Sequence, residues 1–243
     1  MDFWSNKSIA RDLIKYTKIA GAHSVDSIFN IRCLETLADS LPFEDHCEIE
    51  EIVIDFYDRK PIAKTVPKIK AFKISLINSL FSIPGACLDT IDPIRNCTFD
   101  LVITGFCDAI EGKEYINCWH LDKDIREEDD GKHKYTHPLY HFQFGGNHLA
   151  DVTDINGILL MGAPRIPHPP MDIFLSIHFI LNNYFNKNEE TYSFLNDFFN
   201  DTDYQDIMSN AKKRMWYPYF KALSNDQNVN VDLNLANLFP LAV

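Results

Sequence analysis

Residues 98–122, TFDLVITGFCDAIEGKEYINCWHLD, decide the fold. Two runs rich in β-branched and aromatic residues, Thr98–Cys107 and Glu114–Asp122, flank the turn-forming stretch Ala109–Gly112. Such runs separated by a short turn are typical of paired strands. This segment therefore predicts an antiparallel hairpin, around which the rest of the chain is expected to build.

More strands are predicted on both sides of this hairpin: Glu50–Tyr57, Tyr135–Phe144, His148–Val152 and Ile158–Met161. The second and third of these are expected to pair across Gly145-Gly-Asn147, a strong turn signal. Residues 66–82 fit both helical and strand periodicities. Four apolar residues there favour a helix by their spacing: Ile69, Phe72, Leu76 and Leu80.

Helices are predicted at both ends of the chain. Ser8–Ala20 and Ser24–Ser40 form a helical hairpin over residues 1–42, with Gly21 as the stop of the first helix. After residue 170, three segments have helical patterns: Asp172–Phe185, Glu189–Phe199 and Asp203–Phe220, the last bent near Pro218. Residues 228–236 alternate Val or Leu with Asn or Asp, which predicts a terminal strand.

This order of helices, strands and helices predicts one α+β domain over residues 1–243. Residues 48–162 are mainly strands, with an antiparallel sheet over about residues 50–160, and residues 170–222 are helical. The hydrophobic content of 46% is ample for a buried core.

Charge and cysteine usage narrow the possible functions. The net charge of −12 argues against a general DNA-binding surface, because such surfaces cluster Lys and Arg. The six cysteines include no Cys-x-x-Cys pair, which argues against a structural zinc ribbon. The N-terminus lacks the pattern of a signal peptide, and no apolar run approaches a membrane span. We expect a soluble, acidic, cytoplasmic protein of a bacterium.

Six of the nine histidines lie between residues 120 and 168. Three of them, His137, His141 and His168, are candidates for general acid and base catalysis because imidazoles titrate near neutral pH. Arg165 is the candidate for binding a phosphate or carboxylate. The same loop leads into the predicted helix at Asp172, whose N-terminus favours an anion. The alternative is a structural corner between a strand and a helix.

A metal site is disfavoured by strand geometry. If His137 and His141 lie on one strand, their four-residue spacing separates them by about 13 Å, too far for one ion. His120 and Asp122, two residues apart at roughly 7 Å, are a weaker metal-binding alternative that a cross-strand histidine such as His137 could complete. Polar side chains on a solvated sheet face explain the same pair. We therefore predict no metal and no cofactor.

No complete catalytic motif is present: the sequence has neither a phosphate-binding Gly-x-x-x-x-Gly-Lys loop nor a Gly-x-Ser-x-Gly elbow. The leading hypothesis is a noncatalytic subunit of a multiprotein assembly, which binds another protein or its own copy through an acidic surface and the C-terminal tail. Four residues mark a further docking area: Tyr192, Phe198, Phe199 and Tyr204. The alternative hypothesis is a histidine-based hydrolase or nuclease acting on a phosphate ester such as RNA or a nucleotide.

Overall fold

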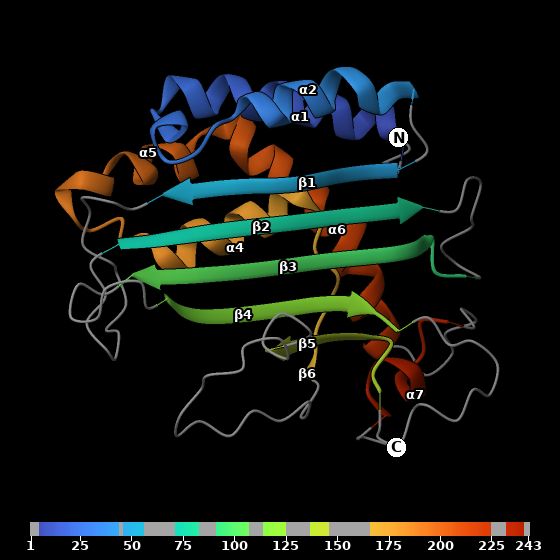
Figure 1. Ribbon diagram of the computed structural model, residues 1–243. Coiled ribbons are helices and arrows are strands. Elements are labelled where there is room, and N and C mark those ends of the chain that lie inside the picture. Colours follow the sequence, from blue (N-terminus) through green and yellow to red (C-terminus); the bar gives the residue numbers. More distant parts are fainter. Residues whose placement is uncertain are drawn as a thin grey trace.

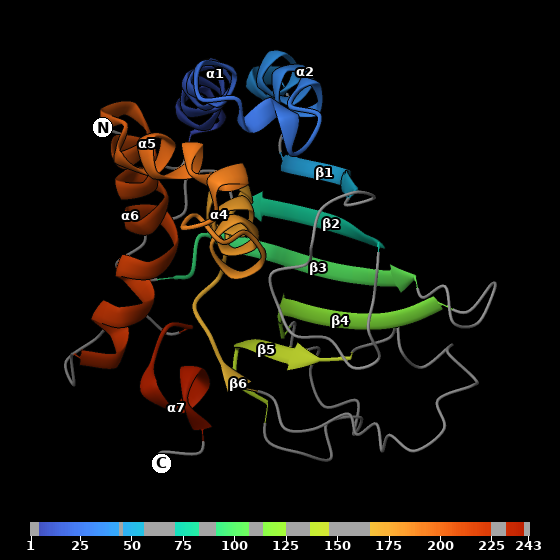
Figure 2. The same ribbon diagram turned by 90° about the vertical axis from the view of Figure 1, so that its left-hand side faces the viewer.

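The computed structural model describes residues 5–43, 46–55, 71–82, 91–106, 114–124, 137–145, 166–224 and 232–240. Within these ranges the architecture is α+β, as predicted. N-terminal helices, a six-stranded antiparallel sheet and C-terminal helices follow one another along the chain (Figure 1). The C-terminal helices lie on one side of the sheet, and the N-terminal helices lie above its edge strand (Figure 2).

The sheet has the simplest possible order, β1-β2-β3-β4-β5-β6, with every neighbouring pair antiparallel. Its strands are β1 (His46–Asp55), β2 (Ala71–Ser82), β3 (Ile94–Phe106), β4 (Glu114–Lys123), β5 (Tyr140–Phe144) and β6 (Ile166–Pro167). The predicted hairpin is confirmed in its pairing, since β3 and β4 pair from Thr98 opposite Asp122 to Phe106 opposite Glu114. The turn between them, and the predicted strands at 148–152 and 158–161, lie outside the described residues.

The helix predicted over residues 66–82 is wrong where the structure describes it, because residues 71–82 form the strand β2. Alternate side chains of this strand, Ile74, Leu76, Asn78 and Leu80, are buried. Asn78 interrupts the apolar alternation, so the pattern that marks a half-buried strand is incomplete in the sequence. Its buried amide donates to Ser176 Oγ and to the Met171 carbonyl oxygen, which satisfies the polar group inside the core.

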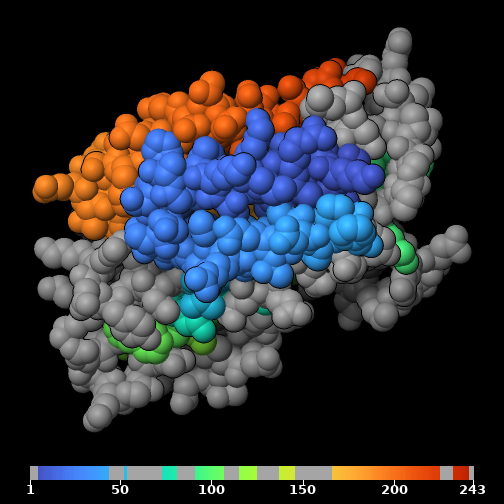
Figure 3. All heavy atoms as spheres, turned by 90° about the horizontal axis from the view of Figure 1, so that it is seen from above, coloured from blue at the N-terminus to red at the C-terminus, as the bar shows by residue number. Residues whose placement is uncertain are grey.

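The N-terminal layer is a helical hairpin of α1 (Asn6–Ala22) and α2 (Arg32–Ser40), separated by the short helix η1 (Val25–Ser27) and followed by η2 (Leu41–Phe43). The Ser5 hydroxyl accepts from the Ser8 N–H and caps α1, while Gly21 lies within the helix rather than ending it. Seen from above, α1 lies between α2 and the C-terminal helices (Figure 3).

The C-terminal layer contains α4 (Ile173–Tyr184), η3 (Glu190–Tyr192), α5 (Phe194–Asn200), α6 (Thr202–Ser224) and α7 (Leu235–Leu238). Asp172 caps α4 by accepting from the Leu175 N–H. The predicted terminal strand is wrong at residues 232–236, where the chain turns into α7. Asn234 accepts from the Asn237 N–H and caps that helix, so an Asn in the alternating pattern serves as a helix cap.

One buried ionic network joins α4 and α6 of this layer to α1 of the N-terminal layer. Arg214 of α6 is fully buried and contacts Asp12 of α1 at 3.0 Å and Asp172 at 3.1 Å. Its guanidinium also lies over the ring of Phe174, 5.6 Å from the centroid. Of the helices in the described ranges, none combines the length and apolar character that crossing a membrane requires.

Candidate functional site

The two faces of the sheet differ in chemistry where β3, β4 and β5 pair. On the face that packs against α4, aromatic residues of neighbouring strands meet Phe179 of the helix: Phe99 and Phe142 both have ring centroids 5.7 Å from it. Trp119 stacks on Phe142 at 5.1 Å. The opposite face carries Asp100, His120, Asp122 and His141, because side chains alternate along each strand.

Pairing between strands brings these polar residues together. Asp100 of β3 lies opposite His120 of β4, and Asp122 of β4 lies opposite His141 of β5. His120 Nδ1 is hydrogen-bonded to Asp100, and its Nε2 lies 2.9 Å from one oxygen of Asp122. His141 Nε2 lies 3.0 Å from the other oxygen of Asp122. The result is an alternating chain of carboxylates and imidazoles across three strands, which we call the His–Asp chain.

His137 joins the end of the His–Asp chain. Its ring meets the His141 ring edge to face, with centroids 4.9 Å apart, and its Nδ1 lies 3.7 Å from the carboxylate of Asp124. The separation of about 13 Å expected for His137 and His141 is therefore wrong. The reason is that β5 begins only at Tyr140, so His137 is not part of the extended strand.

The turn before β5 is held by backbone hydrogen bonds. The Leu139 N–H donates to the Asn237 carbonyl of α7 at 2.8 Å, and the Leu139 carbonyl accepts from the Asp124 N–H at 2.7 Å. These bonds tie residues 137–139 to the C-terminal region and to the end of β4. They place the His137 ring beside His141, although the two residues are four positions apart.

The contacts within the His–Asp chain determine the protonation states of His120 and Asp122. Burial of the His120 ring disfavours its charged form, but hydrogen bonds and the charges of Asp100 and Asp122 outweigh burial and raise its pKa to about 10. Burial likewise opposes ionisation of Asp122, yet His120 and His141 lower the net pKa of that carboxyl. His120 is thus an imidazolium at neutral pH, because only the doubly protonated ring can donate to both carboxylates.

His168 lies on the other face of the sheet, away from His137 and His141. β6 ends at Pro167, which pairs with His141, so His168, the residue after the strand, is directed toward the α4 side. There its ring packs on Phe142, with centroids 5.3 Å apart, and its Nδ1 lies 2.6 Å from the Pro169 carbonyl oxygen. Burial lowers the pKa of His168, only partly offset by that carbonyl. The structure therefore joins two of the three predicted acid/base histidines and separates the third, while Arg165 falls outside the described residues.

The His–Asp chain is poorly suited to metal binding as it stands. Its two imidazoles contact different oxygens of Asp122, so the carboxylate lies between them. Within the described ranges, no group of three or more His, Cys, Asp or Glu side chains is arranged to hold a metal ion. Access is also limited, because His141 is only 3% exposed. A catalytic imidazole has to touch its substrate, so this conformation offers His141 little room to act.

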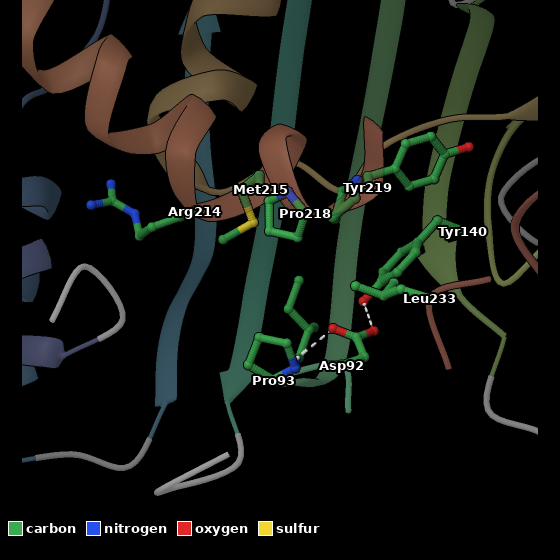
Figure 4. A pocket seen from close by; sticks show the side chains of 10 residues that line it. Asp92, Pro93, Tyr140, Arg214, Met215, Pro218, Tyr219 and Leu233 are labelled. Atoms are coloured by element: carbon green, nitrogen blue, oxygen red, sulfur yellow. Dashed lines mark hydrogen bonds between the residues drawn. The ribbon is translucent and has the colours of Figure 1, made fainter. Parts of the chain in front are cut away.

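A very small pocket of about 10 Å³ lies on the helix side of the sheet (Figure 4). Its walls come from the start of β3, the later part of α6 and Leu233, and none of the predicted catalytic histidines lines it. Asp92 is its polar centre: it accepts from the Tyr140 hydroxyl, pairs with Lys123 at 2.8 Å and accepts from the Ile94 N–H at 3.0 Å. Sites for small molecules usually measure about 300–1,000 Å³, so this pocket is better explained as a structural junction.

Sequence reasoning missed two members of this site, Asp100 and Asp124. Asp100 stands on a different strand from His120, and only the β3–β4 register reveals their contact.

Most of the docking area predicted from aromatic residues is buried. Three of its four members, Tyr192, Phe198 and Tyr204, are at most 1% exposed, because they pack into the core with Tyr16 and Phe185.

No protein-family model, curated protein or solved structure matches this chain. Its function has to be argued from its own residues.

Proposed function

We propose that this chain is a noncatalytic, partner-binding subunit of a multiprotein assembly in the bacterial cytoplasm. One observation carries the proposal: Tyr217 and Phe220 are 62% and 51% exposed, three residues apart on α6. Residues at this spacing lie next to each other on a helix surface. Single exposed apolar residues are ordinary, whereas adjacent aromatic rings are enriched where proteins bind each other.

The surroundings of these rings support a contact surface. Lys213 and Lys221, both exposed, stand four residues before Tyr217 and four residues after it. Lys212 lies over the neighbouring Trp216 ring, 5.8 Å from its centroid. We call Lys213, Tyr217, Phe220 and Lys221 the α6 face. An apolar centre bordered by charged residues is the usual composition of a protein interface.

The proposal is tested with Tyr217→Ser/Phe220→Ser and a matched control, Phe43→Ser. Phe43 is 88% exposed and lies in η2, outside α6. Tagged chains expressed in the native host are purified, and co-purifying proteins and oligomeric state are measured. We expect the control to retain the partner of the wild type, and the double variant to lose it while keeping the wild-type circular dichroism. A monomeric wild type without any partner, or equal capture by all three chains, contradicts the proposal.

A second candidate, a histidine acid/base enzyme acting on a phosphate ester, is favoured by one observation: the His137 and His141 rings are in contact beside Asp122. His168 supplies the control because it lies on the opposite face. His137→Ala and His141→Ala should abolish turnover of RNA or nucleotides, whereas His168→Ala should preserve it. Wild-type chain without turnover, or equal rates in all variants, removes this candidate.

A further inference from the structure

Acidic and basic residues occupy separate parts of the C-terminal helical segment. Residues 189–206 contain six acidic residues and no Lys or Arg, whereas residues 207–224 contain four basic residues and no Asp or Glu. Of the four basic residues, Arg214 is buried and already paired with Asp12 and Asp172. The exposed positive charge of the second segment therefore comes from its lysines, in a chain whose net charge is −12.

One exposed side of α6 carries both an acidic residue and a basic residue, together with the two aromatic rings. Asp206, Lys213, Tyr217 and Phe220 are all exposed. They lie on the same side because they follow one another at intervals of seven, four and three residues, close to whole helical turns. Figure 2 shows α6 along the outer edge of the molecule, with α4 and the sheet on its inner side. Asp203, at the acidic end, is instead paired with Lys15 of α1 at 3.0 Å.

We propose that the partner of the α6 face is a second copy of this chain, whose α6 crosses in the opposite direction about a two-fold axis. In that arrangement, Asp206 of each protomer faces Lys213 of the other, because a two-fold axis repeats every contact with the roles exchanged. The crossing point falls near Ser209, whose short side chain allows two helices to approach, while the Asn210 amide donates to Asp12 of α1. This inference rests on the proposed function and names the partner of the same surface.

The aromatic rings fit this arrangement. Beyond Lys213, the antiparallel register places Tyr217 opposite Thr202 at the start of the partner's α6, and Phe220 opposite the end of the partner's α5. Each copy then contributes two exposed rings, and the dimer contains two Asp206–Lys213 charge pairs. Exposed ion pairs contribute little to affinity individually, so the rings supply most of it and the charges fix the direction.

Two other occupants fit the observations less well. A single-stranded nucleic acid can use lysines and aromatic rings, but phosphates are repelled by Asp206 and by the net charge of −12. An unrelated acidic protein attracts the lysines but repels Asp206, whereas Asp203 already pairs with Lys15 of α1. A second copy satisfies both halves with residues already present in the chain.

The test exchanges charges between the two halves. Asp206→Lys and Lys213→Asp are prepared singly, together in one chain, and as a mixture of the two single variants. Self-association is measured by sedimentation equilibrium. Each single variant places like charges opposite each other twice, so its association constant should fall about tenfold or more. The double variant and the mixture both restore opposite charges and should recover association. Arg32→Asp on α2 is the control, since it makes the same charge change as Lys213→Asp on an exposed residue of another helix.

Failure of the inference is distinct from failure of the proposed function. A wild type that stays monomeric but captures another protein through Tyr217 and Phe220 overturns the second-copy partner and leaves the proposed function standing. The second-copy partner is likewise overturned if the mixture of single variants does not associate, or if a polyuridine oligomer binds in a Lys213-dependent manner without self-association. A monomer that captures nothing overturns both.

Discussion

The two faces of the sheet hold histidine in opposite charge states. On the polar face, Asp100 and Asp122 outweigh the burial of His120 and raise its pKa to about 10. On the helix side, burial lowers the pKa of His168, and burial with the charges of Lys212 and Lys187 lowers that of His178 to about 4. Neighbouring carboxylates, more than burial itself, therefore decide whether an imidazole here carries a proton.

This difference bears on function. His120 is fixed as a cation and His168 and His178 as neutral rings, so none of the three is poised to exchange protons near pH 7. His120 and His168 connect neighbouring strands and packed rings through the contacts described above. The surface that we propose for binding is the α6 face, with its two exposed rings.

The largest expected effect concerns Arg214, a fully buried charged residue on the helix side of the sheet. Arg214→Ala should lower the free energy of unfolding by about 3–5 kcal/mol, because it leaves Asp12 and Asp172 buried without their counter-charge. Urea unfolding measures this effect. Lys18→Ala, at an exposed position of α1, is the control and should change stability by less than about 0.5 kcal/mol. Equal losses of unfolding free energy in both variants would contradict a stabilising role for the buried ionic network.

Next in size is the carboxylate at the centre of the His–Asp chain. Asp122→Asn keeps the shape of the side chain but removes the charge between His120 and His141, and should cost about 2–3 kcal/mol of unfolding free energy. Asp39→Asn, at an exposed carboxylate of α2, serves as the matched control in the same urea experiment. An unchanged free energy of unfolding in Asp122→Asn would mean that the charge of Asp122 does not stabilise the fold.

The third effect appears in alkali. The folded pKa of His120 lies above the ordinary value of 6.5, so its stabilisation is fully present below pH 6.5 and is lost as the pH rises through about 10. Comparing wild type with His120→Gln by urea unfolding should therefore show a stability difference that shrinks toward pH 10. A difference that vanishes already near pH 7 contradicts a charged His120.

The smallest effect appears in acid. Because the folded pKa of His178 is about 4, below the ordinary 6.5, the protein favours the neutral ring. Stability should then decline as the pH falls from 6.5 toward about 4, since the unfolded chain binds the proton first. His178→Gln should remove this part of the decline in thermal unfolding. An identical acid profile for variant and wild type would refute it.

Sequence patterns predict the fold class well because alternation and helical spacing are local. Hairpin pairing of β3 with β4 and the capped start of α4 at Asp172 both follow from neighbouring residues. The prediction fails at β2 because Asn78 occupies a core position, and its partners lie on α4 and the segment before it. Such long-range partners leave no periodic signal.

The candidate site is predictable only in part, for the same reason. The spacing of His120 and Asp122 indicates a pair on one face, and both belong to the His–Asp chain. The position of His137 depends on the bond from Leu139 to Asn237 of α7, far away in the sequence. Grouping His168 with His141 fails because the strand register, which the sequence does not reveal, places the two rings on opposite faces.

The protonation states of these imidazoles separate the two faces most directly, and nitrogen-15 NMR of the ring nitrogens reads them one by one across a pH titration. We predict that His120 keeps both ring protons through neutral pH and titrates at about pH 10, while His178 stays neutral until about pH 4. Titration of both rings near the ordinary 6.5 would contradict the distinction between the two faces and make His120 a candidate acid or base again.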